Sequence, residues 1–574
     1  MSKKTSKIIL TINIIILILA IPGFFLLDNY LKRSNSDPGT IEASPFPDTA
    51  SNPNETVEPN VTLSPKNNDT EDWTAIAPSE IDIVKECLPE RHNFKWDVLK
   101  DGKKLDSYSS NDTFVFGPSN KYNEIDGVTT FRGNNYRNSA SYGFANIREE
   151  KLEKVWSIKI GYIDTWTGVG WNGQPSIVKW NDNLRKKMNL FQDKKDKDDL
   201  KEVIYATLDG NIYFLDLDDG TYTRNPINVG ASLKGSVTVD PRGYPLLYSG
   251  QGIDEVQGKK VPIGFRIYSL LDQKLLYFIN GIDNTAFRYW GAFDSSPLLH
   301  KETDNLFLCG ENGLLYSIKL NTNFDPIQPS ISINPDITKY RYTSPVNGRL
   351  GTENSIAAYK NFGYFADNSG TLQCVDLNTL SPVWVRNITD DTDSTMAIED
   401  LGGSNVFLYI ANEVDLQGEN GYSFVRKINA LTGSLIWEKK YKCSYNVDTN
   451  GGALASPVVG KNEISNLVIF SIAKSYKKNG GKLIAFDKNT GDEVWVIDSD
   501  FYSWSSPVDV YTEDGKAYII HCDSAGYMNL IEGKSGKILD KIPLGGNMEG
   551  SPAVYNDMIV IGTRGQQIFG IRIK

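Results

Sequence analysis

The segment Ala485-Phe486-Asp487-Lys488-Asn489-Thr490-Gly491-Asp492-Glu493-Val494-Trp495 holds the pattern that decides the fold. An alternating strand ends in Asp-x-x-Thr-Gly, and a second strand that carries a tryptophan follows at once. Alternation with a period of two is typical of β-strands, and the Thr-Gly pair supplies the turn between them. Upstream, Ser456-Pro457-Val458 opens an apolar strand of the same unit. The unit is therefore a small antiparallel sheet.

The same order of Ser-Pro or a close variant, apolar strand, glycine turn and alternating strand recurs along the chain. The copies begin at Gln174, Ser236, Ser296, Ser355, Ser394, Ser456, Ser506 and Ser551. Successive starts are on the order of 40 to 60 residues apart, which accommodates four short strands and is the period of propeller blades. We therefore predict an all-β fold, an eight-bladed β-propeller, with seven blades as the alternative.

The two ends of the repeat array predict how the ring closes. The last copy ends with Gln567–Ile573 at the C-terminus and leaves no room for a strand that carries tryptophan. A strand of that type, Lys151–Ile158 with Trp156, stands alone before the first copy. Pairing of these two strands would remove two open sheet edges, so we expect it to complete the final blade.

The string that contains Asp487, Thr490-Gly491 and Trp495 resembles the tryptophan-docking repeat of the pyrroloquinoline-quinone-type (PQQ-like) β-propellers. Weaker copies contain Thr432-Gly433 with Trp437, Asp376 with Trp384, and Ser535-Gly536. The segment Phe131–Arg137 also looks like the lead-in of such propellers, so the resemblance covers about residues 130–574. It implies the fold. The family includes both quinoprotein dehydrogenases and non-enzymatic binding platforms, so the resemblance leaves the function open.

Catalytic members of that family are recognised by an adjacent pair of cysteines beside the quinone and by a calcium site with an aspartate base. The five cysteines here are Cys87, Cys309, Cys374, Cys443 and Cys522, and no two are adjacent. We therefore expect a non-catalytic member with no catalytic residue, no metal and no cofactor. The alternative is an oxidoreductase that uses PQQ and calcium.

The N-terminal region predicts a membrane anchor. Residues 8–27 carry no charge and are long enough as a helix to span a bilayer, with a cleaved signal peptide as the alternative. Lysines before the span favour a cytoplasmic N-terminus and an extracytoplasmic propeller at the cell membrane. We predict a cytoplasmic N-terminus and anchor over 1–33, a disordered linker rich in Ser, Pro, Asn and Thr over 34–80, a small β-rich lead-in over 81–130 and the propeller over 131–574.

The net charge of -11 argues against a nucleic-acid partner, because phosphate binding needs a basic surface.

The loops that enter the first strand of each blade share one face of a propeller, where ligands usually bind. Here these loops are rich in aromatic and acidic residues, which suit a sugar ring or a cationic peptide. The candidate ligand-binding residues are Trp166, Trp171, Tyr289, Trp290, Asp294, Glu353, Asp393, Tyr502, Trp504 and Glu549. The alternative is that they pack one blade against the next. We predict a binding or scaffolding module for an envelope protein or polysaccharide.

Overall fold

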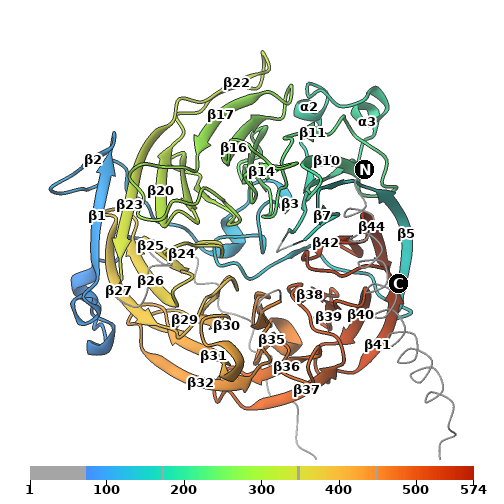
Figure 1. The fold of residues 1–574 in the computed structure, drawn as a ribbon. Coiled ribbons are helices and arrows are strands. Elements are labelled where there is room, and N and C mark those ends of the chain that lie inside the picture. The colour runs from blue at the N-terminus through green and yellow to red at the C-terminus, as the bar shows by residue number, and fades with distance from the viewer. Residues whose placement is uncertain (1–72, 171–172, 345–349, 447–448) are drawn as a thin grey trace, which may run out of the picture. The chain divides into compact units, whose positions relative to one another are not determined.

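The computed structural model describes residues 73–170, 173–344, 350–446 and 449–574, which belong to one compact unit. Over these residues the chain forms eight antiparallel sheets set radially around a central axis, which confirms the predicted eight-bladed propeller (Figure 1). The predicted anchor over 8–27 lies outside the described residues. Within the described part of the chain, no helix is both long and apolar enough to cross a membrane.

The first four blades each run outward from the axis in strand order. Blade 1 has β8 (Ser176–Lys179), β9 (Lys201–Ala206), β10 (Asn211–Asp216) and β11 (Ile227–Asn228). Blade 2 has β12 (Thr238–Val239), β13 (Leu246–Ser249), β16 (Gly264–Ser269) and β17 (Leu275–Asn280). Blade 3 has β18 (Leu298–His300), β19 (Asn305–Cys309), β20 (Leu314–Lys319) and β23 (Asp336–Thr343). Blade 4 has β24 (Ala357–Tyr359), β25 (Phe362–Ala366), β26 (Thr371–Asp376) and β27 (Ser381–Asn387).

The remaining blades follow the same order, except that the outer strand of blade 8 comes from earlier in the chain. Blade 5 has β28 (Ala397–Asp400), β29 (Val406–Ala411), β31 (Tyr422–Asn429) and β32 (Leu435–Lys442). Blade 6 has β34 (Val458–Val459), β35 (Leu467–Ala473), β36 (Gly481–Asp487) and β37 (Glu493–Ser499). Blade 7 has β38 (Val508–Tyr511), β39 (Ala517–Cys522), β40 (Tyr527–Glu532) and β41 (Ile538–Pro543). Blade 8 has β42 (Ala553–Tyr555), β43 (Met558–Thr563), β44 (Gln567–Ile573) and β5 (Leu152–Lys159).

Shorter elements decorate the ring. They are the hairpins β6 (Tyr162–Ile163) with β7 (Trp166–Thr167), β14 (Glu255–Val256) with β15 (Lys259–Lys260), and β21 (Asn323–Asp325) with β22 (Ser330–Ser332). Two short helices, α2 (Asp182–Arg185) and α3 (Gln192–Asp196), lie between β8 and β9. Single 3-10 turns are η1 (Pro78–Glu80), η2 (Lys85–Cys87), η3 (Pro89–His92), η4 (Ser119–Lys121), η5 (Gly418–Asn420) and η6 (Asn462–Ile464).

The repeated serine links neighbouring blades around the axis. In blades 6 to 8 the serine hydroxyl accepts the backbone N–H of the equivalent residue in the preceding blade. Thus Thr395 N–H donates to Ser456 Oγ at 3.1 Å, Ser456 N–H to Ser506 Oγ at 3.0 Å, and Ser506 N–H to Ser551 Oγ at 3.1 Å. These bonds satisfy buried backbone donors where the inner strands begin, which explains the small hydroxyl residue at this position in blades 6 to 8. In blade 5 the equivalent residue is Thr395, one position after the predicted start at Ser394.

The tryptophans dock one blade onto the next, as the repeat predicts. Trp437 of blade 5 donates its indole N–H to the carbonyl oxygen of Lys488 in blade 6 at 3.0 Å. Its ring covers Gly491, where a Cβ would come within 2.7 Å of Trp437 Cδ2. Gly491 also has a φ of +71°. Only glycine meets both demands, so Thr-Gly is a docking site as well as a turn.

The ring closes where the sequence predicts. β44 pairs antiparallel with β5, with Gly570 opposite Trp156. Trp156 then docks onto blade 1, where its indole N–H donates to the carbonyl oxygen of Leu217 at 2.8 Å. The first and last parts of the propeller are thereby held together by the contact that joins the other blades.

The described residues before blade 1 add strands to several blades and fill the centre. β1 (Lys95–Lys100), followed by β2 (Lys103–Lys104), pairs with β23 at the outer edge of blade 3. Trp73 and Ile76, which fall within the range predicted as linker, pack near blade 4. β3 (Asp126–Val128) and β4 (Ser141–Tyr142) pair with the inner strands of blades 1 and 8. Between them the segment 131–138 crosses the middle of the ring (Figure 1).

Two arginines of this segment tie opposite sides of the ring together. Arg132 donates to the carbonyl oxygens of Pro507 and Pro457 at 2.7 and 2.8 Å. Arg137 donates to the carbonyl oxygen of Ser296 at 2.8 Å and that of Ile356 at 2.9 Å. Both guanidinium groups are fully buried. The segment therefore acts as a plug of the central channel that contacts blades 3, 4, 6 and 7.

Candidate functional site

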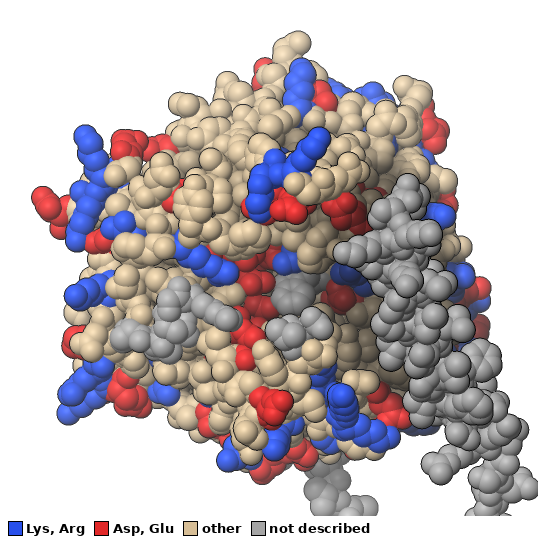
Figure 2. Space-filling view, in the orientation of Figure 1, with Lys and Arg blue, Asp and Glu red and all other residues tan. Residues whose placement is uncertain are grey.

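Two kinds of loop meet on one face of the propeller. Since successive strands of a blade alternate in direction, the loop that enters the first strand and the hairpin between the second and third strands lie at the same end of the sheet. Figure 2 shows Asp and Glu side chains gathered towards the middle of one face. We use the name acidic face for six residues of these loops, which are Asp294, Glu311, Glu353, Asp391, Asp393 and Glu413.

The first carboxylate group consists of Asp294, Glu311 and Glu353. One carboxylate oxygen from each lies within 4.8 Å of the other two. Trp290 donates its indole N–H to Glu311 Oε2 at 2.7 Å, and Asn368 Nδ2 donates to Glu353 Oε1 at 2.8 Å. These neighbours hold the carboxylates in place, as the supporting hydrogen bonds of a metal site do.

The second carboxylate group consists of Asp391, Asp393 and Glu413, and its oxygens also lie within 4.8 Å of one another. All three side chains are buried. Glu413 belongs to the short strand β30 (Glu413–Val414), which pairs with β33 (Gly451–Gly452). This pairing joins a loop of blade 5 to blade 6 and positions Glu413 opposite the loop that carries the two aspartates.

Electrostatic repulsion acts across both groups. Burial, followed by the charge of Glu353, raises the pKa of Asp393 and of Glu311 well above the usual value. Burial and the charge of Asp391 do the same to the pKa of Glu413. Glu353 raises the pKa of members of both groups, so the six carboxylates form one electrostatic unit.

Cations offset only part of this charge. Lys234 Nζ lies 2.9 Å from Asp294 Oδ2, and the nearby carboxylates raise the pKa of Lys234 although burial alone would lower it. The charges of Lys234 and Arg288 also lower the pKa of Glu311. They do not outweigh burial and repulsion, since the pKa of Glu311 is still raised. The acidic face therefore favours additional positive charge or bound protons.

Several buried oxygen atoms of the acidic face accept no hydrogen bond. They are Asp294 Oδ1, Glu311 Oε1, Asp391 Oδ1, Asp393 Oδ1 and Glu413 Oε2. A buried polar atom without a partner costs about 1–3 kcal/mol, and more when it is charged. Calcium binds carboxylate oxygens at about 2.3–2.6 Å, so two of its ligands can lie about 5 Å apart. Oxygens within 4.8 Å of one another match this spacing.

The structure brings together four of the ten residues that the sequence predicted to bind a ligand. Trp290, Asp294, Glu353 and Asp393 belong to the acidic face or contact it. Glu549 forms an ion pair with Arg564 at 3.2 Å, and the Arg564 guanidinium lies 5.9 Å from the ring centre of Trp166. Trp166 and Glu549 therefore share a second cluster around Arg564.

The other nominated residues lie elsewhere. The rings of Tyr502 and Trp504 lie 5.3 Å apart, and Trp504 is buried against Leu454 and Ala473. Trp504 thus has the contacts of a packing residue. Tyr289 is 76% exposed. Trp171 lies outside the described residues.

Sequence reasoning missed Lys234, Glu311, Asp391 and Glu413. Glu311 precedes the hairpin glycine Gly313 by two residues, and Asn368 of blade 4 has the same place before Gly370. Both side chains reach the acidic face. The position two residues before the hairpin glycine could have identified these residues from the sequence, because it lies at the same end of the blade as the loops that carry the predicted binding residues.

A quinone of the PQQ type would bring further negative charge to the acidic face. Such a quinone carries carboxylate groups of its own, which the six carboxylates of the acidic face would repel. The five cysteines are buried as free thiols, and no two are adjacent. A hard divalent cation fits the same oxygen ligands well.

Comparison with known proteins establishes the fold. No protein-family model matches this chain, and no curated protein sequence matches it. The structure is similar to that of a quinohemoprotein alcohol dehydrogenase from Pseudomonas putida HK5, with a TM-score of 0.53 and 13% identity over 78% of this chain and 80% of that chain. Matches of lower TM-score include BamB from Moraxella catarrhalis, with a TM-score of 0.43 and 14% identity over 74% of this chain and 98% of that chain. The chain therefore has an eight-bladed propeller fold that resembles the PQQ quinoprotein type.

Proposed function

We propose that this chain is a binding propeller of the cell envelope whose acidic face takes up a divalent cation such as calcium. The observation that carries the proposal is the pair of buried carboxylate groups, whose oxygens are spaced for one ion and include atoms without a hydrogen-bond partner. In this proposal residues 8–27 anchor the chain, and the loaded face binds an envelope protein or polysaccharide.

A small cation suits these groups better than a lysine side chain of a partner. An ammonium group at the surface would have to enter a site whose ligands Asp391, Asp393 and Glu413 are nearly fully buried. A desolvated ion of charge +2 can instead contact three oxygens at once. The proposal places the propeller outside the cell, where calcium-binding modules have dissociation constants of about 10⁻⁴–10⁻³ M.

Thermal denaturation with and without calcium tests this proposal. If the dissociation constant is about 10⁻⁴ M, calcium at one hundred times that concentration should stabilise the protein by about 2.7 kcal/mol. The double variant Asp393→Asn, Glu413→Gln keeps the side-chain shapes, leaves the first carboxylate group intact and should lose the part of this gain that comes from the second group. The matched control is Glu419→Gln, which removes an exposed carboxylate close to Glu413 in sequence and should keep it. An equal gain for the double variant would argue against the acidic face.

Dye-linked oxidation tests the enzymatic alternative. The protein is incubated with PQQ and calcium, and alcohols or sugars are offered as substrates. We expect no turnover above that of the protein without the quinone, because no two of the cysteines are adjacent, as they are in the catalytic members of the PQQ-like family. Turnover that depends on PQQ would replace the binding proposal with an oxidoreductase.

A further inference from the structure

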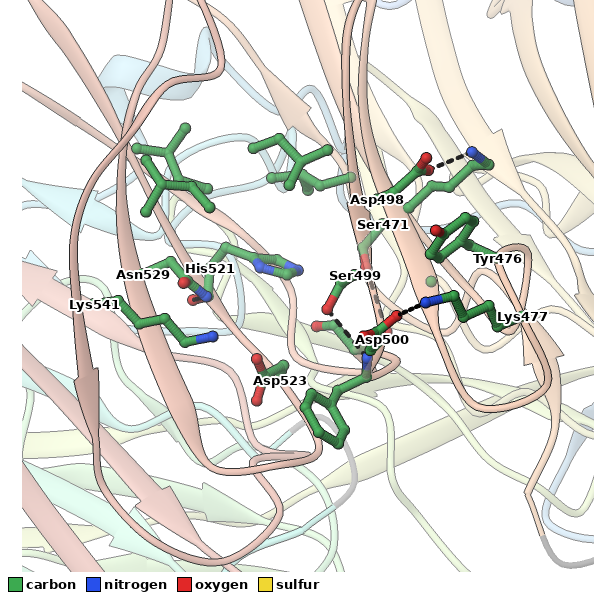
Figure 3. Close-up of a pocket in the computed structure, with 18 residues that line it drawn as sticks. Ser471, Tyr476, Lys477, Asp498, Ser499, Asp500, His521, Asp523, Asn529 and Lys541 are labelled. Carbon is green, nitrogen blue, oxygen red and sulfur yellow. Dashed lines mark hydrogen bonds and ion pairs between the residues drawn. The ribbon is translucent and has the colours of Figure 1, made fainter. Parts of the chain in front are cut away.

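A pocket of about 420 Å³ lies between blades 6 and 7 and shares no residue with the acidic face (Figure 3). One wall comes from β35, β36 and β37, and the other comes from β39, β40 and β41. Its volume is within the range of about 300–1,000 Å³ that is typical of small-molecule sites. Blade interfaces are normally filled by side chains, so the cavity needs an explanation.

At one position that lines the cavity, blade 7 carries smaller and more polar side chains than blades 1, 3 and 4 carry at the equivalent position. His521 of β39 pairs across the sheet with Asn529 of β40. The equivalent cross-strand pairs, counted from the hairpin glycine, are Tyr205 with Tyr213, Leu308 with Tyr316, and Phe365 with Gln373. In each of those pairs at least one partner is a large side chain that is fully buried. Blade 7 therefore has less side-chain volume at this position than blades 1, 3 and 4.

His521 presents an unused polar atom to this space. The residue is only 7% exposed, and its Nε2 has no hydrogen-bond partner. Figure 3 shows the imidazole directed between the two walls. Burial, followed by the charge of Lys541, lowers the pKa of His521 to about 4. The ring is therefore neutral at pH 7 and offers one donor and one acceptor.

The charged groups that line the pocket are balanced. Lys477 pairs with Asp500 at 2.5 Å, and Lys482 pairs with Asp498. The third lysine and the third aspartate of the lining are Lys541 and Asp523. This balance gives no net attraction for a charged ligand. The pocket therefore favours a molecule without net charge.

The uncharged lining combines an apolar wall with hydrogen-bonding groups. Leu483, Ile497 and Ile531 supply apolar surface, and Ser471 and Asn529 add polar groups beside His521. A ring with hydroxyl groups matches this combination, because its C–H faces pack on aliphatic side chains while each hydroxyl both donates and accepts. We propose that this pocket binds a neutral hydroxyl-rich ring of monosaccharide size, with one hydroxyl hydrogen-bonded to His521 Nε2.

Histidine-selective NMR of the full-length chain tests the proposal, since the sequence has only three histidines. The probes are glucose and N-acetylglucosamine, with glucuronate and glucosamine as charged analogues. At least one neutral probe should shift the ring resonances of His521 saturably and leave those of His300 unchanged. The charged analogues should bind about tenfold more weakly. No shift of His521 with either neutral probe, or a shift with a charged analogue alone, would overturn the proposal.

A variant that copies blade 4 separates binding from folding. The double substitution His521→Phe, Asn529→Gln introduces the pair that blade 4 has at these positions, Phe365 and Gln373. It removes the imidazole, narrows the cavity and should melt no lower than the wild type. Saturation transfer from the protein to the neutral sugar should disappear. Transfer that persists in the folded variant would place the sugar elsewhere and refute the assignment. The wild-type histidine shift decides the matter independently if the variant does not fold.

Discussion

The substitution Trp156→Ala tests how the ring is closed. Trp156 is 7% exposed, and its ring lies against two glycines, Gly570 of its own blade and Gly220 of blade 1. Truncation of a buried aromatic residue costs about 3–5 kcal/mol, and the hydrogen bond to Leu217 contributes about 1 kcal/mol of that. We therefore expect the free energy of unfolding to fall by about 4 kcal/mol. Trp156→Phe keeps most of the ring and should cost about 1–2 kcal/mol.

Urea denaturation followed by far-UV circular dichroism measures these losses, and hydrogen exchange locates them. If β5 holds the last blade closed, the amides of β44 should exchange faster in Trp156→Ala, while those of blade 4 should not. The matched variant is Trp384→Ala, which removes the same kind of docking contact between blades 4 and 5. A loss below about 1 kcal/mol for Trp156→Ala, with β44 still protected, would refute the closure argument.

Two further predictions concern the acidic face and the docking turn. Buried carboxylates with raised pKa values bind more protons when folded than when unfolded, so their contribution to stability is lost as pH rises from about 4 through their raised pKa values. Without calcium, the melting temperature should therefore fall more between pH 5 and 8 in the wild type than in Asp393→Asn, Glu413→Gln, and parallel curves would contradict this. Gly491→Ala should cost about 2–3 kcal/mol in urea denaturation, because it adds a clash with Trp437 to the backbone strain of a φ of +71°. Gly545→Ala, with a φ of +76° and open space around it, should cost only about 1 kcal/mol, and equal losses would remove the clash from the explanation.

The repeat could be predicted from the sequence because each of its signals has a local cause. Position 491 requires glycine because its φ is positive and the ring of Trp437 lies against it. Position 456 requires a hydroxyl because Ser456 accepts a backbone N–H from the preceding blade. Such demands recur once per blade and therefore appear as a period. The closure by Trp156 followed from the same rule, since a strand with a docking tryptophan needs a neighbouring blade.

The site was harder to predict because it is not periodic. Asp294 and Glu353 were nominated from their loops, but Glu311 and Glu413 come from hairpins inside the blades. Their meeting depends on the closure of the ring and on the pairing of β30 with β33, which no local pattern encodes. The contacts of the central plug could not be predicted for the same reason. The sequence identifies Arg132 as part of a lead-in, but no local pattern indicates that its guanidinium donates to carbonyl oxygens of two blades.

Isothermal titration of calcium into the protein measures whether the acidic face binds this ion. We expect saturable binding to the wild type and to Glu419→Gln, with a dissociation constant of about 10⁻⁴–10⁻³ M and with fewer protons released per bound ion as pH rises. Asp393→Asn, Glu413→Gln should lose the heat of the ion held by the second carboxylate group while remaining folded by circular dichroism. Binding of equal strength and stoichiometry to the double variant, or no binding to the wild type, would contradict the account.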